Sequence, residues 1–324
     1  MIARALLLLG VLTACFGCSD DLPSFFDIEK FRLLGLSATP PTIRQDESAT
    51  LSALVTEADA EYQWTWCPLS SGTFGAFECA ITEEELQALI DEAVGAGVIT
   101  VPPYDLGTGA TATWTFDLPA AGFSAFCDFL LESGADLPEG ADFPDCEEGY
   151  DLQIRLDTRL GDESVTGVRD LRLLLDDDDQ ANNNPSILGA RAVELDDQGE
   201  EVGGDIVVDA DVPAQLERDK VYKFFIDVPA SDAEPFFEVP VGGTEPVERL
   251  DDLTVAWFRE GGEFDKNRTG FIDGTSEFEL LLENEFTTPT AEDYEDGQLR
   301  LFWTIRDNRG GTGFFQRTIE LVEP

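Results

Sequence analysis

Hydrophobic and polar residues alternate along many short segments of this chain. The segments 49–55, 62–66 and 152–156 each place apolar side chains at every second position. A strand buried on one face produces this period of two. Turn residues separate the segments, and no long array of helical periodicity occurs. The pattern therefore predicts an all-β protein built from β-sandwiches.

The second half of the chain repeats the design of the first. The apolar positions of segment 299–303 follow those of segment 152–156 at constant spacing, and Trp257 matches Trp66. Such self-similarity predicts a duplicated domain. We expect two β-sandwiches in tandem, at residues 30–176 and 186–324, joined by an acidic Asp/Asn linker at 177–185.

The first domain carries an insertion at about residues 67–147. Far more residues lie between Trp66 and the segment 152–156 than between Trp257 and the matching segment 299–303. Within the insertion, Thr82 and Glu85 form a capping-box pattern ahead of an apolar stripe that ends before Gly95. We therefore predict a helix there, and a second short helix at 124–132.

The N-terminus has the form of an export signal. One basic residue, a short apolar run and small residues precede Cys15. The tetrad Leu12-Thr13-Ala14-Cys15 matches the lipobox, in which the cysteine is acylated before cleavage. Residues 1–14 are then the signal peptide, and residues 15–29 are the acylated cysteine and a tether. Cys18 fits the pattern less well, and an unacylated signal peptide is the remaining alternative. Several acyl chains would give stable membrane attachment.

Four further cysteines, Cys67, Cys79, Cys127 and Cys146, form an even set. In an exported chain such a set predicts two disulfides. Three pairings are possible, and proximity in sequence favours Cys67–Cys79 and Cys127–Cys146. The cysteines lie in or beside the insertion, so we expect disulfides to link the helical insertion to the first sandwich.

The mid-domain tryptophans and the closing turn Arg306-Asp307-Asn308-Arg309-Gly310-Gly311 resemble bacterial immunoglobulin-like domains found behind lipoboxes on cell-surface proteins. The resemblance covers roughly residues 30–176 and 185–324 and concerns the architecture. It implies tandem immunoglobulin-like sandwiches in a cell-envelope lipoprotein. Because Phe16 rather than Asp follows Cys15, it also implies the outer membrane, at its periplasmic face or the cell surface. The chain departs from antibody-type domains because no disulfide can join the sheets of the second domain.

Charge and composition narrow the chemistry. With 67 acidic and 20 basic residues, the net charge of −47 repels nucleic acid and favours cationic partners. Adaptation to salt explains this charge better than dedicated cation binding. The chain has no histidine and no phosphate-binding glycine loop, so we expect no enzyme and no required cofactor.

Two candidate sites remain. Calcium is the one cofactor that the sequence suggests, through Asp177, Asp179, Asn182 and Asn184 in the linker, where oxygen ligands gather. The alternative is a solvated acidic linker. Trp64 is a candidate sugar-stacking residue, although a tryptophan on such a strand belongs more often to the core.

The favoured function is a non-enzymatic, membrane-anchored, extracytoplasmic binding or adhesion module. Its helical insertion is the expected contact region, and an envelope protein or a polysaccharide is the expected partner. The alternative is a structural subunit or spacer of an envelope assembly.

Overall fold

A computed structural model describes residues 24–73, 76–115, 149–176, 179–208, 212–240 and 242–323. Strands make up most of its elements, so the structure is mostly β, in agreement with the coarse class of the predicted all-β fold. The predicted signal peptide, Cys15, Asp177 and the Cys127–Cys146 pair lie outside the described residues. No helix in the described ranges is long and apolar enough to cross a membrane.

The N-terminal half, residues 24–176, contains two sheets. One has the order β1 (Leu33–Thr39), β3 (Ser48–Val55), β6 (Thr111–Thr115). The other has the order β2 (Thr42–Ile43), β8 (Glu163–Leu173), β7 (Tyr150–Leu160), β4 (Glu61–Cys67), β5 (Asp105–Gly107). Both contribute to one hydrophobic cluster that includes Leu51, Trp66 and Trp114. The predicted helix is confirmed as α2 (Glu83–Val94), beginning at the Thr82 capping box.

The C-terminal half, residues 179–323, also contains two large sheets. One has the order β10 (Glu201–Val207), β9 (Gly189–Leu195), β12 (Val221–Asp227), β18 (Glu283–Thr287), β16 (Glu263–Phe264). The other has the order β11 (Ala214–Glu217), β20 (Thr312–Val322), β19 (Gln298–Asp307), β15 (Leu253–Arg259), β17 (Arg268–Phe271). A separate hairpin pairs β13 (Pro235–Glu238) with β14 (Val247–Leu250), and the short helices are η2 (Ala230–Asp232) and α4 (Glu279–Leu282). Trp257, Trp303 and Phe224 lie in this half's core.

The two halves share one strand arrangement. In each, a long antiparallel hairpin, β7–β8 or β19–β20, is flanked by a tryptophan-bearing strand on one side and by a parallel strand on the other. The register corrects one detail of the predicted repeat. In the C-terminal half, Trp257 pairs with Trp303. At the predicted spacing Trp303 corresponds to Leu156, and Leu156 pairs with Trp64. The residue equivalent to Trp257 is therefore Trp64 and not Trp66.

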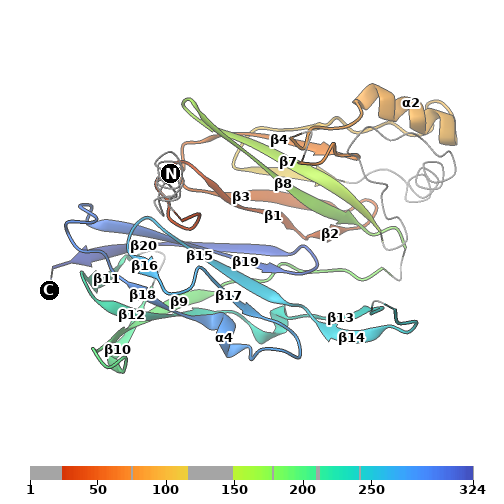
Figure 1. Cartoon of the computed structure of the whole chain (residues 1–324). Helices are drawn as coiled ribbons and strands as arrows, with labels where there is room; N and C mark the ends of the chain where they lie inside the picture. Colours follow the sequence, from red (N-terminus) through yellow and green to blue (C-terminus); the bar gives the residue numbers. More distant parts are fainter. Residues whose placement is uncertain are drawn as a thin grey trace, which may run out of the picture.

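The halves lie side by side along their length (Figure 1). A third hydrophobic cluster fills the seam between them, with Leu34 and Leu54 from the N-terminal half and Phe258 and Phe302 from the C-terminal half. Polar contacts border this cluster, such as the hydroxyl of Ser37, which donates to the carbonyl oxygen of Thr312 at 2.6 Å.

Part of the predicted tether belongs to this seam. The amide of Ile28 donates to the carbonyl of Arg259 at 2.8 Å, and the amide of Arg259 donates to the carbonyl of Phe26 at 3.1 Å. The Arg259 guanidinium lies 2.8 Å from the carboxylate of Asp27. Residues 26–28 therefore pack against β15 before the chain enters β1.

Truncation of Phe302 tests how strongly the seam stabilises the protein. Phe302 is 0% exposed, and Phe302→Ala would leave a cavity between the halves, so we expect a loss of about 3–4 kcal/mol of unfolding free energy in urea. The matched control is Phe237→Ala, because Phe237 is 54% exposed and a change there should stay within about 0.5 kcal/mol. Equal effects of the two variants would contradict this role for the seam.

Candidate functional site

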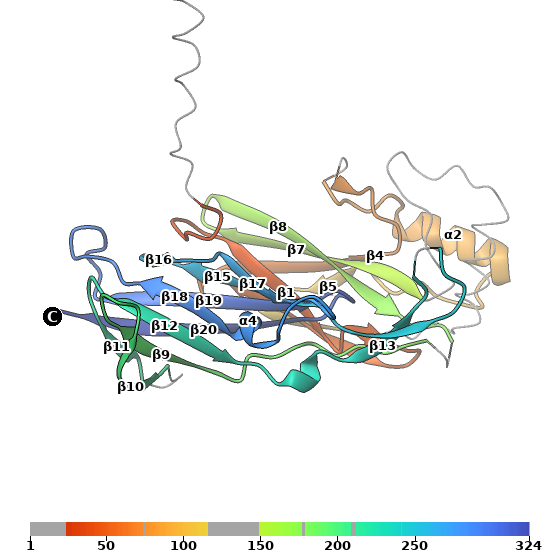
Figure 2. The ribbon, with the colours of Figure 1, turned by 60° about the horizontal axis from the view of Figure 1, so that its bottom comes forward.

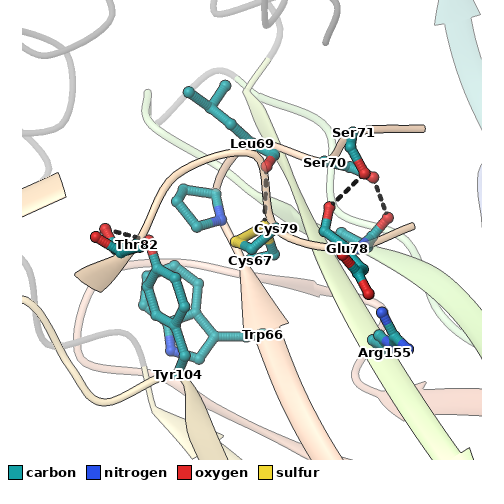
Figure 3. The surroundings of a disulfide bond; sticks show 12 residues. Trp66, Cys67, Leu69, Ser70, Ser71, Glu78, Cys79, Thr82, Tyr104 and Arg155 are labelled. Carbon is teal, nitrogen blue, oxygen red and sulfur yellow. Dashed lines mark hydrogen bonds between the residues drawn. A yellow bond between two sulfur atoms is a disulfide. The ribbon is translucent and has the colours of Figure 1, made fainter. Parts of the chain in front are cut away.

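A disulfide closes the loop that follows β4 (Figure 3). Cys67, the last residue of β4, bonds to Cys79, with the two Cα atoms 5.5 Å apart. Within the loop, the amide of Ser71 donates to the carbonyl of Glu78 at 2.9 Å, and the amide of Ala80 donates to the carbonyl of Leu69 at 2.7 Å. The structure thus confirms the predicted Cys67–Cys79 pairing and shows a short stapled hairpin.

This stapled loop is fixed to the outer face of the sheet. The side-chain amide of Gln153 donates to the carbonyl of Phe77 at 2.8 Å, and its oxygen accepts from the hydroxyl of Ser70. Ala76 and Phe77 both adopt the left-handed backbone region, with φ of 54° and 59°. Non-glycine residues rarely hold this conformation unless the surrounding structure imposes it, and such residues gather at functional sites.

Helix α2 follows directly and is bound to the segment that comes after it. Leu86 and Ile90 pack into the core. The Gln87 side chain donates to the carbonyl of Ile99 and accepts from the amide of Val101, each at 2.9 Å. These contacts hold the apolar face of the helix against the core of the N-terminal half, so the other face remains available to a partner.

That exposed face is acidic. The first turn consists of Glu83, Glu84 and Glu85, and the last turn has no basic residue. The helix dipole favours these carboxylates at the N-terminus. Tyr104, whose ring packs on Trp66 at 5.1 Å, has its pKa raised by burial and then by the same glutamates. The loop and helix together form a rigid, anionic projection.

Trp64 is not a surface residue. Its side chain is 1% exposed, and its indole nitrogen donates to the carbonyl of Gly109 at 2.9 Å. The prediction that Trp64 stacks on a sugar is therefore wrong. Trp64 and Trp66 alternate with polar residues on one strand, so both rings enter the core together.

The described linker residues predicted to bind calcium make hydrogen bonds to the protein itself, and that of Asn184 crosses the seam. The Asp179 carboxylate accepts from the amides of Leu175 and Asp176 at 2.8 and 2.9 Å. The Asn182 amide donates to the carboxylate of Asp307, and that of Asn184 donates to the carbonyl of Ala38.

The described linker residues do not converge on one point. Among the described residues, no group of three or more acidic or cysteine side chains could hold a metal, and Asn182 Oδ1 is a buried oxygen without a partner there. With Asp177 outside the described part of the chain, calcium binding stays a prediction.

The linker contact depends on residues to which the sequence analysis gave no role at the linker. Arg309 makes a bidentate ion pair with Asp251, both contacts being 2.7 Å long, and Asp251 is 0% exposed. The same guanidinium donates to the carbonyl of Ala181 in the linker at 3.0 Å. Gly311 is required nearby, because a Cβ there would lie 2.7 Å from the carbonyl oxygen of Asn183. The Arg-Asp-x-Arg-Gly-Gly turn was the sequence signal for this contact, because its Asp307 and Arg309 bind the linker residues Asn182 and Ala181.

Comparisons with known proteins give distant structural neighbours. No protein-family model matches the sequence, and no curated protein matches it either. The chain is similar to native Escherichia coli alpha-2-macroglobulin, with a TM-score of 0.23 and 10% identity over 90% of this chain and 17% of that one. It is similar to the four N-terminal Ig domains of Dscam1, with a TM-score of 0.20 and 12% identity over 91% and 52% of the two chains.

A third neighbour is SGBP-B of the Bacteroides ovatus mixed-linkage glucan utilization locus, in complex with a heptasaccharide. Its TM-score is 0.18, with 10% identity over 91% of this chain and 48% of that one. The chain spans about a fifth of the length of the two E. coli alpha-2-macroglobulin chains that it matches. Scores this low establish neither a family nor a shared activity.

Removal of the disulfide should loosen the stapled loop. The bridge spans 12 residues, and closing a loop of that size stabilises a protein by about 3 kcal/mol. We expect the double variant Cys67→Ala/Cys79→Ala to lose about that much unfolding free energy in urea. Reductant should bring the wild type toward the variant, and a variant as stable as the wild type would contradict a stabilising bridge.

The buried Arg309–Asp251 pair should contribute far more to the unfolding free energy than an exposed ion pair of the same geometry. Asp251→Asn leaves the Arg309 charge partly unpaired, so we expect a loss of about 3 kcal/mol of unfolding free energy. The matched control is Asp151→Asn, whose exposed bidentate partner is Arg172 at 2.9 and 3.0 Å. That variant should lose less than about 1 kcal/mol. Similar losses would contradict a special role for the linker pair.

Proposed function

We propose that the chain is a lipoprotein exported to the cell envelope, anchored through Cys15, that acts as a non-enzymatic binding or adhesion module. The export signal and lipobox support the anchor, and the absence of histidine from the sequence argues against most hydrolytic mechanisms. In this proposal the two halves are tandem immunoglobulin-like sandwiches, and the stapled loop and α2 belong to the insertion of the first.

The position of the stapled loop and α2 carries the proposal. They lie at one end of the molecule, whereas the described chain begins near the other end, in both views (Figures 1 and 2). A chain anchored through its N-terminus would hold this end away from its attachment point. We call it the distal end, and it comprises residues 68–73 and 76–81, α2 and the β13–β14 hairpin.

The distal end can serve as a contact surface because it is ordered before binding. The disulfide fixes its loop, and side-chain hydrogen bonds fix its helix. A preformed surface loses less conformational entropy when a partner binds than a flexible one does.

The anchor is tested by substitution of the acylated residue. We expect Cys15→Ala to abolish incorporation of labelled fatty acid, because its thiol is the proposed site of acylation, and to release the protein from the membrane fraction. Cys18→Ala is the matched control and should keep both properties. Loss of labelling in the Cys18 variant alone would move the anchor to that residue, and no labelling of the wild type would refute a lipoprotein.

Protease treatment of intact cells tests the exposure of the anchored body. Digestion without lysis is the result expected of a surface adhesion module. Protection until lysis would place the body in the periplasm and would favour the structural-subunit function instead.

A further inference from the structure

The β13–β14 hairpin has two unlike faces. Phe236 faces the body of the protein, where it is 8% exposed and its ring lies 5.0 Å from the Arg309 guanidinium carbon. Because neighbouring side chains on a strand alternate, Phe237 faces away from the body, and it is 54% exposed. Leu250, which pairs with Pro235 on the same face as Phe237, is 38% exposed. One face thus anchors the hairpin and the other presents apolar side chains to solvent.

Exposed apolar residues are concentrated here. Val239, directly after β13, is 58% exposed. Val247 begins β14 opposite Glu238, so it lies on the other face from Phe237, and it is 47% exposed. With Phe237 and Leu250 they place four large apolar side chains on one small hairpin. Exposed apolar side chains gathered on one element are typical of a surface that binds another molecule.

Both edges of the hairpin are occupied near its base. The side chain of Gln180 accepts from the amide of Phe237 at 2.7 Å and donates to its carbonyl at 2.8 Å. On the opposite edge, the Asp273 carboxylate accepts from the amide of Leu250 at 3.3 Å. Edge groups satisfied in this way do not pair with an additional strand. A partner would therefore contact the side chains of the solvent face.

The acidic residues of the hairpin indicate the charge of its partner. Glu238, Glu245 and Glu248 lie on the hairpin, and its single base, Arg249, is paired with Glu238 at 3.2 Å and with Asp273 at 2.9 Å. A second copy of a chain with a net charge of −47 would be repelled. On the solvent face Glu248 lies directly opposite Phe237. Apolar side chains beside a carboxylate on an acidic hairpin are complementary to a segment that is both apolar and cationic.

We propose that the solvent face of the β13–β14 hairpin docks an apolar, cationic segment of a partner protein. This proposal rests on the proposed binding function and names its partner class. Phe237 and Leu250 would bury their side chains in the contact, and the surrounding glutamates would pair with lysine or arginine at its rim.

A synthetic peptide of alternating lysine and valine is the probe. It would be titrated onto the full-length protein in phosphatidylcholine nanodiscs, with empty nanodiscs as the background. The double variant Phe237→Ser/Leu250→Ser should weaken binding about tenfold, because two apolar contacts are lost. Val207→Ser, at a position 66% exposed on β10, is the matched control and should bind as the wild type does.

Two further peptides separate specific docking from general attraction. Peptides that alternate lysine with serine, or glutamate with valine, should each bind at least about tenfold more weakly than the probe. Equal binding of the probe to wild type and both variants, or equal binding of the lysine–serine peptide, would overturn the proposal. An unchanged urea midpoint of each variant shows that the fold is intact. The peptide titration is independent of fatty-acid labelling at Cys15. A failure of the docking proposal can therefore be distinguished from a failure of the proposed lipid anchor.

Discussion

The seam between the two halves is the constraint on which the arrangement of this protein depends. A chain with a net charge of −47 repels itself when compact, and the seam opposes that repulsion in two ways. Leu34, Phe258 and Phe302 exclude water from its centre. At its border, the Arg169 guanidinium from β8 donates to the carbonyl of Leu36 at 3.1 Å and to the hydroxyl of Thr312 at 2.7 Å. One cation therefore joins strands from both halves, and burial lowers its pKa to about 10, which leaves it charged at neutral pH.

This use of arginine shapes the outer surface as well. Arg300 pairs with Glu260 in its own half and with Glu57 across the seam, at 3.0 Å for the latter contact, and Arg309 pairs with buried Asp251. Arginine suits such positions because its planar fork binds two oxygens at once and stays charged when partly buried. Scarce basic residues placed between the halves cannot neutralise carboxylates elsewhere. The last turn of α2 has no basic residue, and the single base of the β13–β14 hairpin is already paired, so both elements remain acidic.

Local signals predicted local structure well. The Thr82 capping box specified α2 because its donors and acceptors lie within one helical turn, and proximity selected Cys67–Cys79 because a short loop constrains the pairing. Trp64 was misjudged because strand alternation shows which residues share a face but not which face another sheet covers. The linker was harder still, since the partners of Asn182 and Asn184 lie more than 120 residues away in sequence. Polar composition indicated solvent or metal, whereas these amides satisfy groups at the seam.

Fixing the halves against one another also fixes the distal end. The stapled loop and α2 come from the N-terminal half, and the β13–β14 hairpin comes from the C-terminal half. A flexible joint would therefore let them move independently. Gln180 ties the linker to Phe237, and Arg309 ties it to Asp251 beside β14. The seam therefore sets the separation of two acidic projections before any partner arrives. A partner that contacts both would meet a preorganised surface, and the second contact would form at a high effective concentration.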